Sequence, residues 1–364
     1  MNFQLPKSRT PDFNQDKFLS APNAKIVEVI KDGVAPDNYH AMSIFPEYFK
    51  IAGKWILASE SRMDCVPVLS DDGSIKVVEF RNLKTGQKVF VGRTEDASEG
   101  IYVYAEGLRS KDSQVDLFAF RAGRSRETAY SKDYNNLYEL LRYEKENGYI
   151  VWVLGPAVVF DFDSRCALSN LIDEGYVHAI LAGNAMATHD LEAGLFNTAL
   201  GQNTYTQESV KDGHYNHLDL INKARKAGSL PALLKQEKIT DGVVYSALKN
   251  NIPLVLAGSI RDDGPLPSVI SDVYQAQDEM RKHTRKATTL ICLATQLHTI
   301  ASGNMTPSYT VRKGEIRPVY IYYVDIAEFA VNKLRDRGSL EVTTIVTNVQ
   351  DFLVNLKNNL CKKP

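Results

Sequence analysis

The residue types best suited to chemistry in this chain follow one apolar run. Arg261, Asp262 and Asp263 come directly after the run at 253–258, and Gly264 and two prolines follow them. A guanidinium can hold a carboxylate or phosphate at two points, and a carboxylate nearby can hold an ammonium group or move a proton. The structural alternative is a surface ion pair, worth about 1 kcal/mol or less. Because the glycine and prolines would hold the turn rigid, we predict Arg261, Asp262 and Asp263 as catalytic residues.

Two further apolar runs end in small or polar residues. The run at 177–182 leads into Gly183 and Asn184, and the run at 289–293 leads into Ala294 and Thr295. Polar residues follow each run: Thr188, His189 and Asp190 after the first, and Gln296, His298, Ser302 and Asn304 after the second. Parallel strands of an open sheet form a ligand crevice beyond their carboxyl ends. We therefore expect the three turns to meet at one site.

Histidines are weaker candidates. His189, His214, His217 and His298 lie near predicted strand ends or helix starts. Each is more often a hydrogen-bonded structural residue, although one of them could act as a general base near neutral pH. His214 and His217 have helical spacing, but no carboxylate-rich motif with ligand spacing accompanies them, so no metal site is expected.

Asp64 and Cys65 follow a predicted strand around Trp55 and place a carboxylate beside a thiol. A thiol in a loop is usually incidental, because only a thiolate is a good nucleophile. We retain both residues as further catalytic candidates.

Signs of nucleotide binding come from two other turns. Gly155 and Pro156 follow an apolar strand and precede a predicted helix at 164–174, where backbone amides could approach a phosphate. Gly-Pro also simply ends strands, and the chain contains no Gly-x-Gly-x-x-Gly fingerprint. Asp325 closes the apolar run at 319–324, a position from which an acid can bind ribose hydroxyls. The alternative for Asp325 is a helix N-cap.

Composition limits the classes of protein. The 364 residues are 44% hydrophobic and 24% charged, with a formal net charge of -1, so no nucleic-acid partner is expected. The start of the sequence does not read as a signal peptide, and no long uncharged apolar stretch occurs, so we expect a soluble, cytoplasmic protein without a membrane partner. Four dispersed cysteines without a Cys-x-x-Cys pair favour reduced thiols: Cys65, Cys166, Cys292 and Cys361.

The pattern along the chain predicts two kinds of domain. Residues 1–23 are expected as an extended arm, and residues 24–148 as a β-rich domain with strands at 24–30, 75–80, 88–91 and 101–104 and a helix near 133–146. Residues 149–364 alternate strands and helices. Strands are predicted at 149–154, 177–182, 253–257, 288–293, 318–324 and 341–346. This alternation predicts an α/β fold with a doubly wound, mostly parallel sheet of roughly six strands.

Four segments together resemble a known family. Residues 181–190, 213–218, 256–267 and 293–304 are similar to the archaeal-type ornithine cyclodeaminase family. That family includes the carboxyl-terminal domain of the cyanobacterial bifunctional arginine dihydrolase and proteins described as a lysine-ketoglutarate reductase/saccharopine dehydrogenase (LOR/SDH) conserved domain. The resemblance runs almost continuously from about residue 155 to 353 and is patchier before residue 121. Residues 121–148 do not match it.

The resemblance implies a deoxyhypusine-synthase-like NAD-binding domain at 149–364 and a substrate or oligomerisation role for 24–148. The implied reaction is that of a lyase in arginine catabolism and proline biosynthesis: L-ornithine gives L-proline and ammonia, by internal hydride transfer with bound NAD. Asp262 or Asp263 would be the base, Arg261 the carboxylate clamp, and Asn184 and Asn304 orienting groups. The cofactor-binding residues would be Gly155, Pro156, Gly183, Asn184, Ala185, Gly258, Ser259, Ala294, Thr295, Asn304 and Asp325.

Two alternatives stay open at this point. An NAD(P)-dependent imino-acid or opine-type amino-acid dehydrogenase would use the same chemistry but would not return the hydride, so NADH would change stoichiometrically. A non-catalytic NAD-binding module would bind the cofactor without turning over any basic amino acid. A homo-oligomer is expected from the family in each case.

Overall fold

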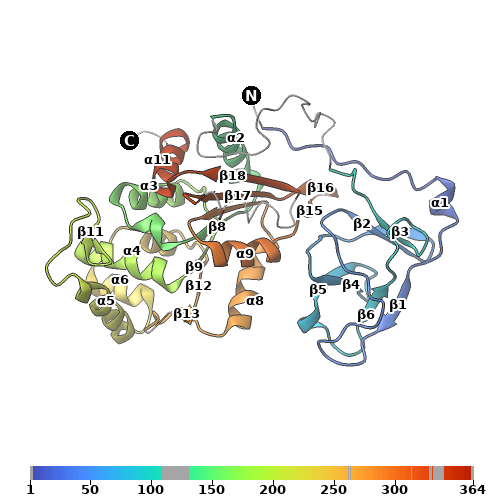
Figure 1. Cartoon of the computed structure of the whole chain (residues 1–364), viewed down its shortest axis with the longest axis horizontal. Helices are drawn as coiled ribbons and strands as arrows, with labels where there is room; N and C mark the ends of the chain where they lie inside the picture. Colours follow the sequence, from blue (N-terminus) through green and yellow to red (C-terminus); the bar gives the residue numbers. More distant parts are fainter. Residues whose placement is uncertain are drawn as a thin grey trace.

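The computed structural model describes residues 3–108, 131–260, 262, 264–312, 314–327, 330 and 340–361. Its larger part is built on a parallel sheet with the strand order β13-β12-β9-β8-β14-β17-β18 (Figure 1). The strands are β8 (Ile150–Leu154), β9 (Ala179–Gly183), β12 (Leu254–Ala257), β13 (Val269–Ile270), β14 (Thr289–Leu293), β17 (Tyr320–Asp325) and β18 (Glu341–Val346).

Both faces of this sheet are covered, and the central strand β8 shows why. All of its residues are buried. Ile150, Trp152 and Leu154 contribute to one core, whereas Val151 and Val153 contribute to a second core on the opposite face. Successive side chains of a strand point to opposite faces, so a strand covered on both sides reads as a continuous apolar run.

Helices supply the two covering layers. The first core takes apolar side chains from α2, α3, α4, α5, α6, α7 and α11, and the second from α8 and α9. Their bounds are α2 (Ser131–Asn147), α3 (Phe162–Asp173), α4 (Asn184–Phe196), α5 (His214–Ala227), α6 (Leu230–Glu237), α7 (Val243–Lys249), α8 (Val273–Thr284), α9 (Gln296–Met305) and α11 (Val349–Leu360). A short 3-10 helix, η2 (Pro156–Val159), and the pair β10 (Thr198–Ala199) and β11 (Gln202–Asn203) complete this part.

The smaller part consists of two antiparallel sheets, ordered β1-β6-β4-β5 and β3-β2-β7. Their strands are β1 (Lys25–Glu28), β2 (Glu47–Ile51), β3 (Lys54–Leu57), β4 (Cys65–Leu69), β5 (Ile75–Glu79), β6 (Lys88–Val91) and β7 (Ile101–Val103), with the 3-10 helix η1 (Phe80–Asn82) after β5. Before them, the single turn α1 (Asp16–Leu19) lies in the predicted arm. The buried Lys50 ammonium holds this turn by donating to the carbonyl oxygens of Phe18, Leu19 and Ala21.

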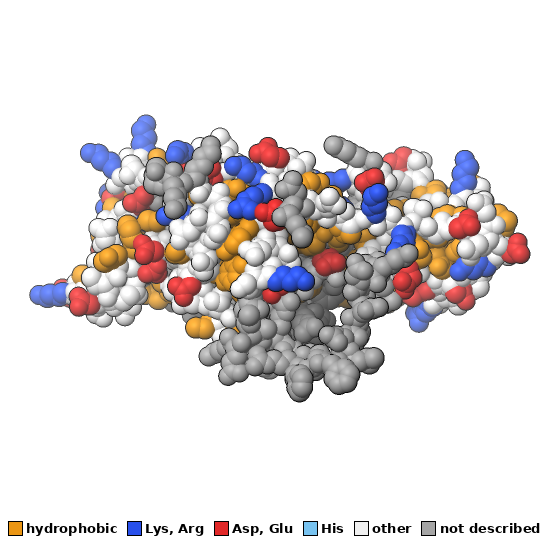
Figure 2. Space-filling model, turned by 90° about the horizontal axis from the view of Figure 1, so that it is seen from above, with side chains coloured by type: hydrophobic (Ala, Val, Ile, Leu, Met, Phe, Trp, Pro, Cys, Tyr) orange, Lys and Arg blue, Asp and Glu red, His pale blue; other side chains and the backbone are white. Residues whose placement is uncertain are grey.

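A hairpin connects the two parts. Strands β15 (Tyr309–Arg312) and β16 (Glu315–Pro318) pair with each other, and Thr310 forms an isolated bridge with Glu60 of the β-rich part. The Ser308 amide donates to the Ser61 carbonyl at 3.0 Å, and the Ser308 hydroxyl donates to the Ile44 carbonyl at 2.6 Å. The hairpin therefore extends from the α/β part to the β-rich part. Figure 2 shows acidic and basic side chains mixed over one face of the molecule.

The predicted α/β fold with a parallel sheet is confirmed, and every strand predicted after residue 148 overlaps an observed one. The strands without a predicted counterpart are β2, β4, β10, β11, β13, β15 and β16. Strand β13 has two residues, and β4 contains Pro67, a residue that argues against an inner strand.

The predicted domain boundary at residue 148 stays a prediction. Helix α2, on the amino-terminal side of it, buries Leu137, Leu140 and Leu141 in the core of the α/β part. Within the described ranges, no helix combines the length and the apolar character needed to span a bilayer.

Candidate functional site

The site begins where the strand order reverses. Strands β8 and β14 are parallel neighbours, but the strands that follow β8 lie on one side of it and those that follow β14 lie on the other. The backbones approach closely at this point, because a Cβ on Gly155 would lie 2.0 Å from the Ala294 carbonyl oxygen. Glycine at 155 is therefore required by the close packing of the turns after β8 and β14. A topological switch of this kind opens a crevice at the carboxyl ends of the strands.

A cavity of about 380 Å³ occupies that position, and we call it the carboxyl-edge cavity. The turns after β8, β9, β12 and β14 all contribute to its wall. The predicted residues that line it are Gly155, Pro156, Gly183, Asn184, Ala185, Ser259, Asp262 and Thr295. The three strand-end turns singled out in the sequence therefore do meet at one place.

Two helices begin at this cavity. Helix α4 follows Gly183 and helix α9 follows Thr295, and among the described residues neither helix has a side-chain cap at its first turn. The first amides of a helix lack intrahelical partners and carry the positive end of the helix dipole, so they attract an anion. The cavity therefore offers the backbone amides of two helix starts as hydrogen-bond donors. This set of donors fits the pyrophosphate of a dinucleotide.

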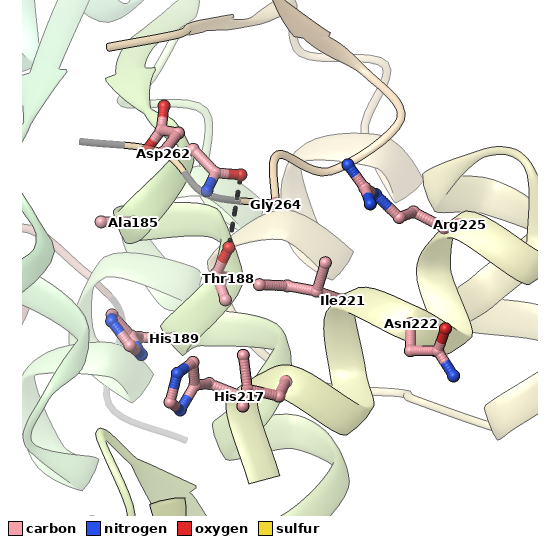
Figure 3. A pocket seen from close by; sticks show the side chains of 11 residues that line it. Ala185, Thr188, His189, His217, Ile221, Asn222, Arg225, Asp262 and Gly264 are labelled. Atoms are coloured by element: carbon pink, nitrogen blue, oxygen red, sulfur yellow. Dashed lines mark hydrogen bonds between the residues drawn. The ribbon is translucent and has the colours of Figure 1, made fainter. Parts of the chain in front are cut away.

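Asn184 positions the turn that carries Asp262. Its side-chain oxygen accepts a hydrogen bond from the Leu266 amide at 3.0 Å and a longer one from the Thr188 hydroxyl at 3.4 Å, the dashed line in Figure 3. The Asp262 carboxylate accepts a hydrogen bond from the Ser259 amide at 2.8 Å. Arg261 and Asp263, the other predicted catalytic residues of this turn, lie outside the described residues.

His298 is a wall residue that the sequence indicated only as one of several histidines. It lies in the first turn of α9 and approaches Gly183 so closely that a Cβ on Gly183 would be 3.0 Å from its Cε1 atom. Burial lowers the pKa of His298, and the Asp262 carboxylate opposes this in part. A neutral imidazole can therefore face the cavity near pH 7.

A second cavity of about 410 Å³ adjoins the first, and we call it the α4–α5 chamber after the helices on either side (Figure 3). Asn184, Ala185, His189 and Asp262 line both cavities. The chamber is completed by residues of α5, among them His217 and Arg225. The sequence indicated His217 only as one of several histidines and did not indicate Arg225, because only the folded chain brings α5 beside α4.

His189 and its neighbour Asp190 have different surroundings. The buried Asp190 carboxylate accepts hydrogen bonds from the Arg165 guanidinium at 2.7 Å and from the Val243 and Val244 amides at 3.0 and 2.7 Å. Asp190 therefore joins α3, α4 and the start of α7 within the core. It does not line either cavity, whereas His189 lines both.

Other predicted cofactor residues lie near the cavity without lining it. Gly258 lines a smaller cavity together with Ser259 and Asp262. Asp325 ends β17 at the same sheet edge, but its carboxylate accepts from the Ala327 amide at 2.9 Å, which closes a local turn. Ala294 lies at the switch point beside Gly155. Asn304 is near the carboxyl end of α9, and its side-chain oxygen is buried.

Asp64 and Cys65 do not line this cavity, because they belong to the β-rich part. Asp64 is exposed in a turn with a left-handed backbone (φ 60), and Cys65 begins β4 with its side chain buried. Burial raises the pKa of the Cys65 thiol to about 12. This thiol is therefore protonated at neutral pH and is a poor nucleophile.

The chain matches known proteins over most of its length. Residues 136–356 match the family described as arginine dihydrolase ArgZ-like, C-terminal, Rossmann fold. An ornithine cyclodeaminase of Methanocaldococcus jannaschii is 38% identical over 96% of this chain and 82% of its own length. The bifunctional arginine dihydrolase/ornithine cyclodeaminase AgrE of Nostoc sp. is 36% identical over 93% of this chain and 47% of its own length.

Solved structures agree with the sequence matches. A conserved LOR/SDH protein from Methanococcus maripaludis S2 superimposes with a TM-score of 0.84 at 34% identity, over 93% of this chain and 98% of that one. A ternary complex of AgrE with ornithine and NAD+ gives a TM-score of 0.59 at 35% identity, over 94% of this chain and 46% of that one. The resemblance seen in the sequence is thereby confirmed: the chain belongs to the ArgZ-like Rossmann-fold family, together with the archaeal ornithine cyclodeaminases.

Proposed function

We propose that this chain is an NAD-dependent ornithine cyclodeaminase, which converts L-ornithine to L-proline and ammonia. The observation that carries the proposal is the carboxyl-edge cavity at the β8/β14 switch point, where α4 and α9 begin. Family membership supports it, since AgrE, which matches 94% of this chain, has been crystallised with ornithine and NAD+.

The residues of the carboxyl-edge cavity would hold the dinucleotide. The first amides of α4, at Asn184 and Ala185, and the start of α9 after Thr295 are placed to donate to phosphate oxygens. NAD supplies a hydride acceptor at the substrate carbon that later returns the hydride, so the conversion has no net redox change. The absence of a Gly-x-Gly-x-x-Gly motif is no obstacle, because two helix starts provide the donors.

The chain itself must bind the amino acid, move protons and exclude water. The Asp262 carboxylate lies on the wall shared by the two cavities and is suited to hold a substrate ammonium group. Phe160, Leu200 and Leu297 give the carboxyl-edge cavity an apolar lining, which helps to protect an imine from hydrolysis. The roles predicted for Arg261 as clamp and Asp263 as base remain predictions for residues beyond the described set.

The deciding experiment follows three quantities in one reaction. The purified protein is incubated with NAD+ and L-ornithine, and proline, ammonia and absorbance at 340 nm are measured together, with D-ornithine as the control. We expect equal amounts of proline and ammonia from the L isomer without accumulation of NADH. Accumulating NADH would instead identify an amino-acid dehydrogenase. Bound NAD with no turnover of ornithine or any other basic amino acid would identify a non-catalytic module.

We also propose that the protein assembles as a homo-oligomer. Large apolar side chains are exposed along the carboxyl edge of the sheet: Ile260 after β12, Leu297 at the start of α9 and Ile326 after β17. Exposed apolar residues gathered near a site often mark an interface. Sedimentation equilibrium measures the mass directly, and a monomer at micromolar concentration would refute this part of the proposal.

A further inference from the structure

The α4–α5 chamber has the position and size of a pocket for an amino acid. Its volume of about 410 Å³ lies in the range of small-molecule sites, roughly 300–1,000 Å³. It shares Asn184, Ala185, His189 and Asp262 with the carboxyl-edge cavity. A molecule in the chamber would therefore lie directly beside a dinucleotide bound at the switch point.

His189, on the shared wall, is held by a buried carboxylate. Its Nδ1 atom lies 2.9 Å from Glu192 Oε2, and both side chains are buried. Glu192 also accepts hydrogen bonds from the Thr198 hydroxyl at 2.8 Å and from the amides of Leu200 and Gly201 at 3.1 and 3.0 Å. The carboxylate is thus fixed by groups from the segment after α4, and it fixes the imidazole in turn.

The surroundings of Glu192 favour its ionised form. Burial by itself raises the pKa of Glu192, but hydrogen bonds from His189, the Gly201 amide and Thr198 outweigh burial, so its pKa lies below the ordinary value. An ionised carboxylate keeps the proton of the neighbouring imidazole on Nδ1 and leaves Nε2 as the atom that can accept another. This is the same division of roles that a carboxylate and a histidine have in a hydrolase triad.

The far side of the chamber carries a cation. Figure 3 shows Arg225 of α5 and His189 of α4 on opposite sides of the chamber. The Arg225 Nε donates to the Pro265 carbonyl at 3.3 Å, which holds the guanidinium against the turn that follows Gly264. A diamino acid carries one carboxylate and two ammonium groups. A cation at one side, with a carboxylate and an imidazole at the other, matches that arrangement of charge.

We propose that the α4–α5 chamber binds the diamino acid, that Arg225 holds its carboxylate, and that His189 is the catalytic base with Glu192 as its positioning residue. This proposal rests on the proposed function. In the proton step, an N–H bond of a substrate ammonium group breaks and an Nε2–H bond forms, which leaves a neutral amine and an imidazolium. Both ammonium groups lose a proton in this way, the α-ammonium as the hydride leaves and the δ-ammonium before it attacks. The ring nitrogen then passes one proton to the nitrogen that departs, and the two protons taken up earlier end on the released ammonia and on the ring nitrogen of proline. Monocationic L-ornithine thus gives zwitterionic proline and ammonium, with every proton accounted for.

Several titratable groups face His189 from the surrounding elements. Glu192 is on its own helix, His217 faces it from α5 with ring centres 6.2 Å apart, and Asp262 shares its wall from the turn after β12. His298 from α9 lines the adjoining cavity, and Arg225 lies across the chamber. Any of these groups could contribute to the pH dependence of activity. A change in that dependence can therefore be assigned to His189 only by comparing variants, and the test is designed accordingly.

The test compares kcat, KM and NAD+ affinity in three variants and two controls. His189→Gln should lower kcat by about 100-fold or more, the usual contribution of a general base. Arg225→Met should raise KM for ornithine at least about tenfold, equal to ~1.4 kcal/mol. We expect all variants to bind NAD+ within about threefold of the wild type, well under the ~1.4 kcal/mol of a tenfold change. His214→Gln and Lys226→Met, exposed on α5 and lining neither cavity, should behave as the wild type.

Glu192→Gln separates positioning from simple structural support. Loss of the negative charge makes protonation of His189 harder, so the acidic limb of the kcat/KM profile should move to lower pH while kcat falls. A structural role alone would lower the melting temperature without moving the limb. If this variant does not fold, His189→Gln still decides whether the imidazole is the base.

The two proposals fail in different ways. A wild type that makes proline while His189→Gln and Arg225→Met keep wild-type kinetics would overturn the chamber proposal and leave the ornithine cyclodeaminase function intact. A wild type that makes no proline would refute the proposed function. The chamber would then be judged by calorimetric binding of ornithine to the NAD-loaded protein, and binding unchanged by Arg225→Met would overturn it.

Discussion

The region around α4 and the cleft between the β-rich part and helix α8 are both rich in charge, but their ion pairs differ in exposure. On the buried face of α4, Asp190 pairs with Arg165 of α3 at 2.7 Å, and neither side chain has more than slight exposure. This cleft, about 760 Å³, is bordered by the pairs Arg81–Asp278 and Arg285–Glu60, at 2.7 and 2.6 Å, in which at least one member is well exposed.

This difference in exposure suggests which ion pairs hold the cavity-lining residues in place. The buried pair under α4 makes a rigid base, so that the other face of the helix can direct His189 and the helix start toward the two cavities. The pairs at the cleft join the β-rich part to the α/β part but remain in contact with water, where screening weakens them. The site therefore depends on desolvated pairs beneath it rather than on the number of charges around it.

The largest expected effect is on the buried pair. Arg165→Met would leave Asp190 ionised in the core with only the amide hydrogen bonds of Val243 and Val244, so the free energy of unfolding should fall by about 3–5 kcal/mol. Arg285→Met, at a half-exposed arginine, should lower the free energy of unfolding by about 1 kcal/mol or less. Urea unfolding of both variants measures the difference. Equal losses in the two variants would remove the distinction between the regions.

A smaller effect is expected at the cavity wall. A side chain at Gly183 would contact His298 and occupy the space before α4, so Gly183→Val should weaken NAD+ binding about tenfold or more, that is ~1.4 kcal/mol or more. Gly183→Ala should weaken it less, because the His298 ring can shift. Calorimetric titration gives both affinities, and melting curves check that both variants are folded. Unchanged affinity in the valine variant would place the dinucleotide elsewhere.

The smallest effect is a dependence of stability on pH. Burial lowers the pKa of His178, His283 and His298 in the folded protein. The unfolded chain therefore takes up protons first as the pH falls below about 6.5, and the free energy of unfolding should decrease below that pH. Urea unfolding at pH 7.5 and 5.5 tests this, and His283→Gln should reduce the decrease. A protein that becomes more stable on acidification to pH 5.5 would contradict the assignment.

The sequence alone was sufficient to predict the sheet and its functional edge. Runs such as residues 150–154 are apolar without interruption because β8 is covered on both faces, and this pattern distinguishes a parallel strand from one that alternates. Parallel strands end at the same edge. Small and polar residues after three such strands therefore had to come together, and Gly183, Asp262 and Thr295, which follow β9, β12 and β14, do line one cavity.

Only the tertiary structure decided which of two neighbouring side chains lines the cavities. His189 and Asp190 are adjacent in the sequence, but successive residues of a helix are rotated by about 100°, so one faces the cavities and the other faces Arg165. The burial of Cys65 and the approach of α5 with Arg225 likewise depend on contacts between distant segments. A sequence pattern reports which faces are apolar, whereas the partner of each polar side chain is set by packing across the fold.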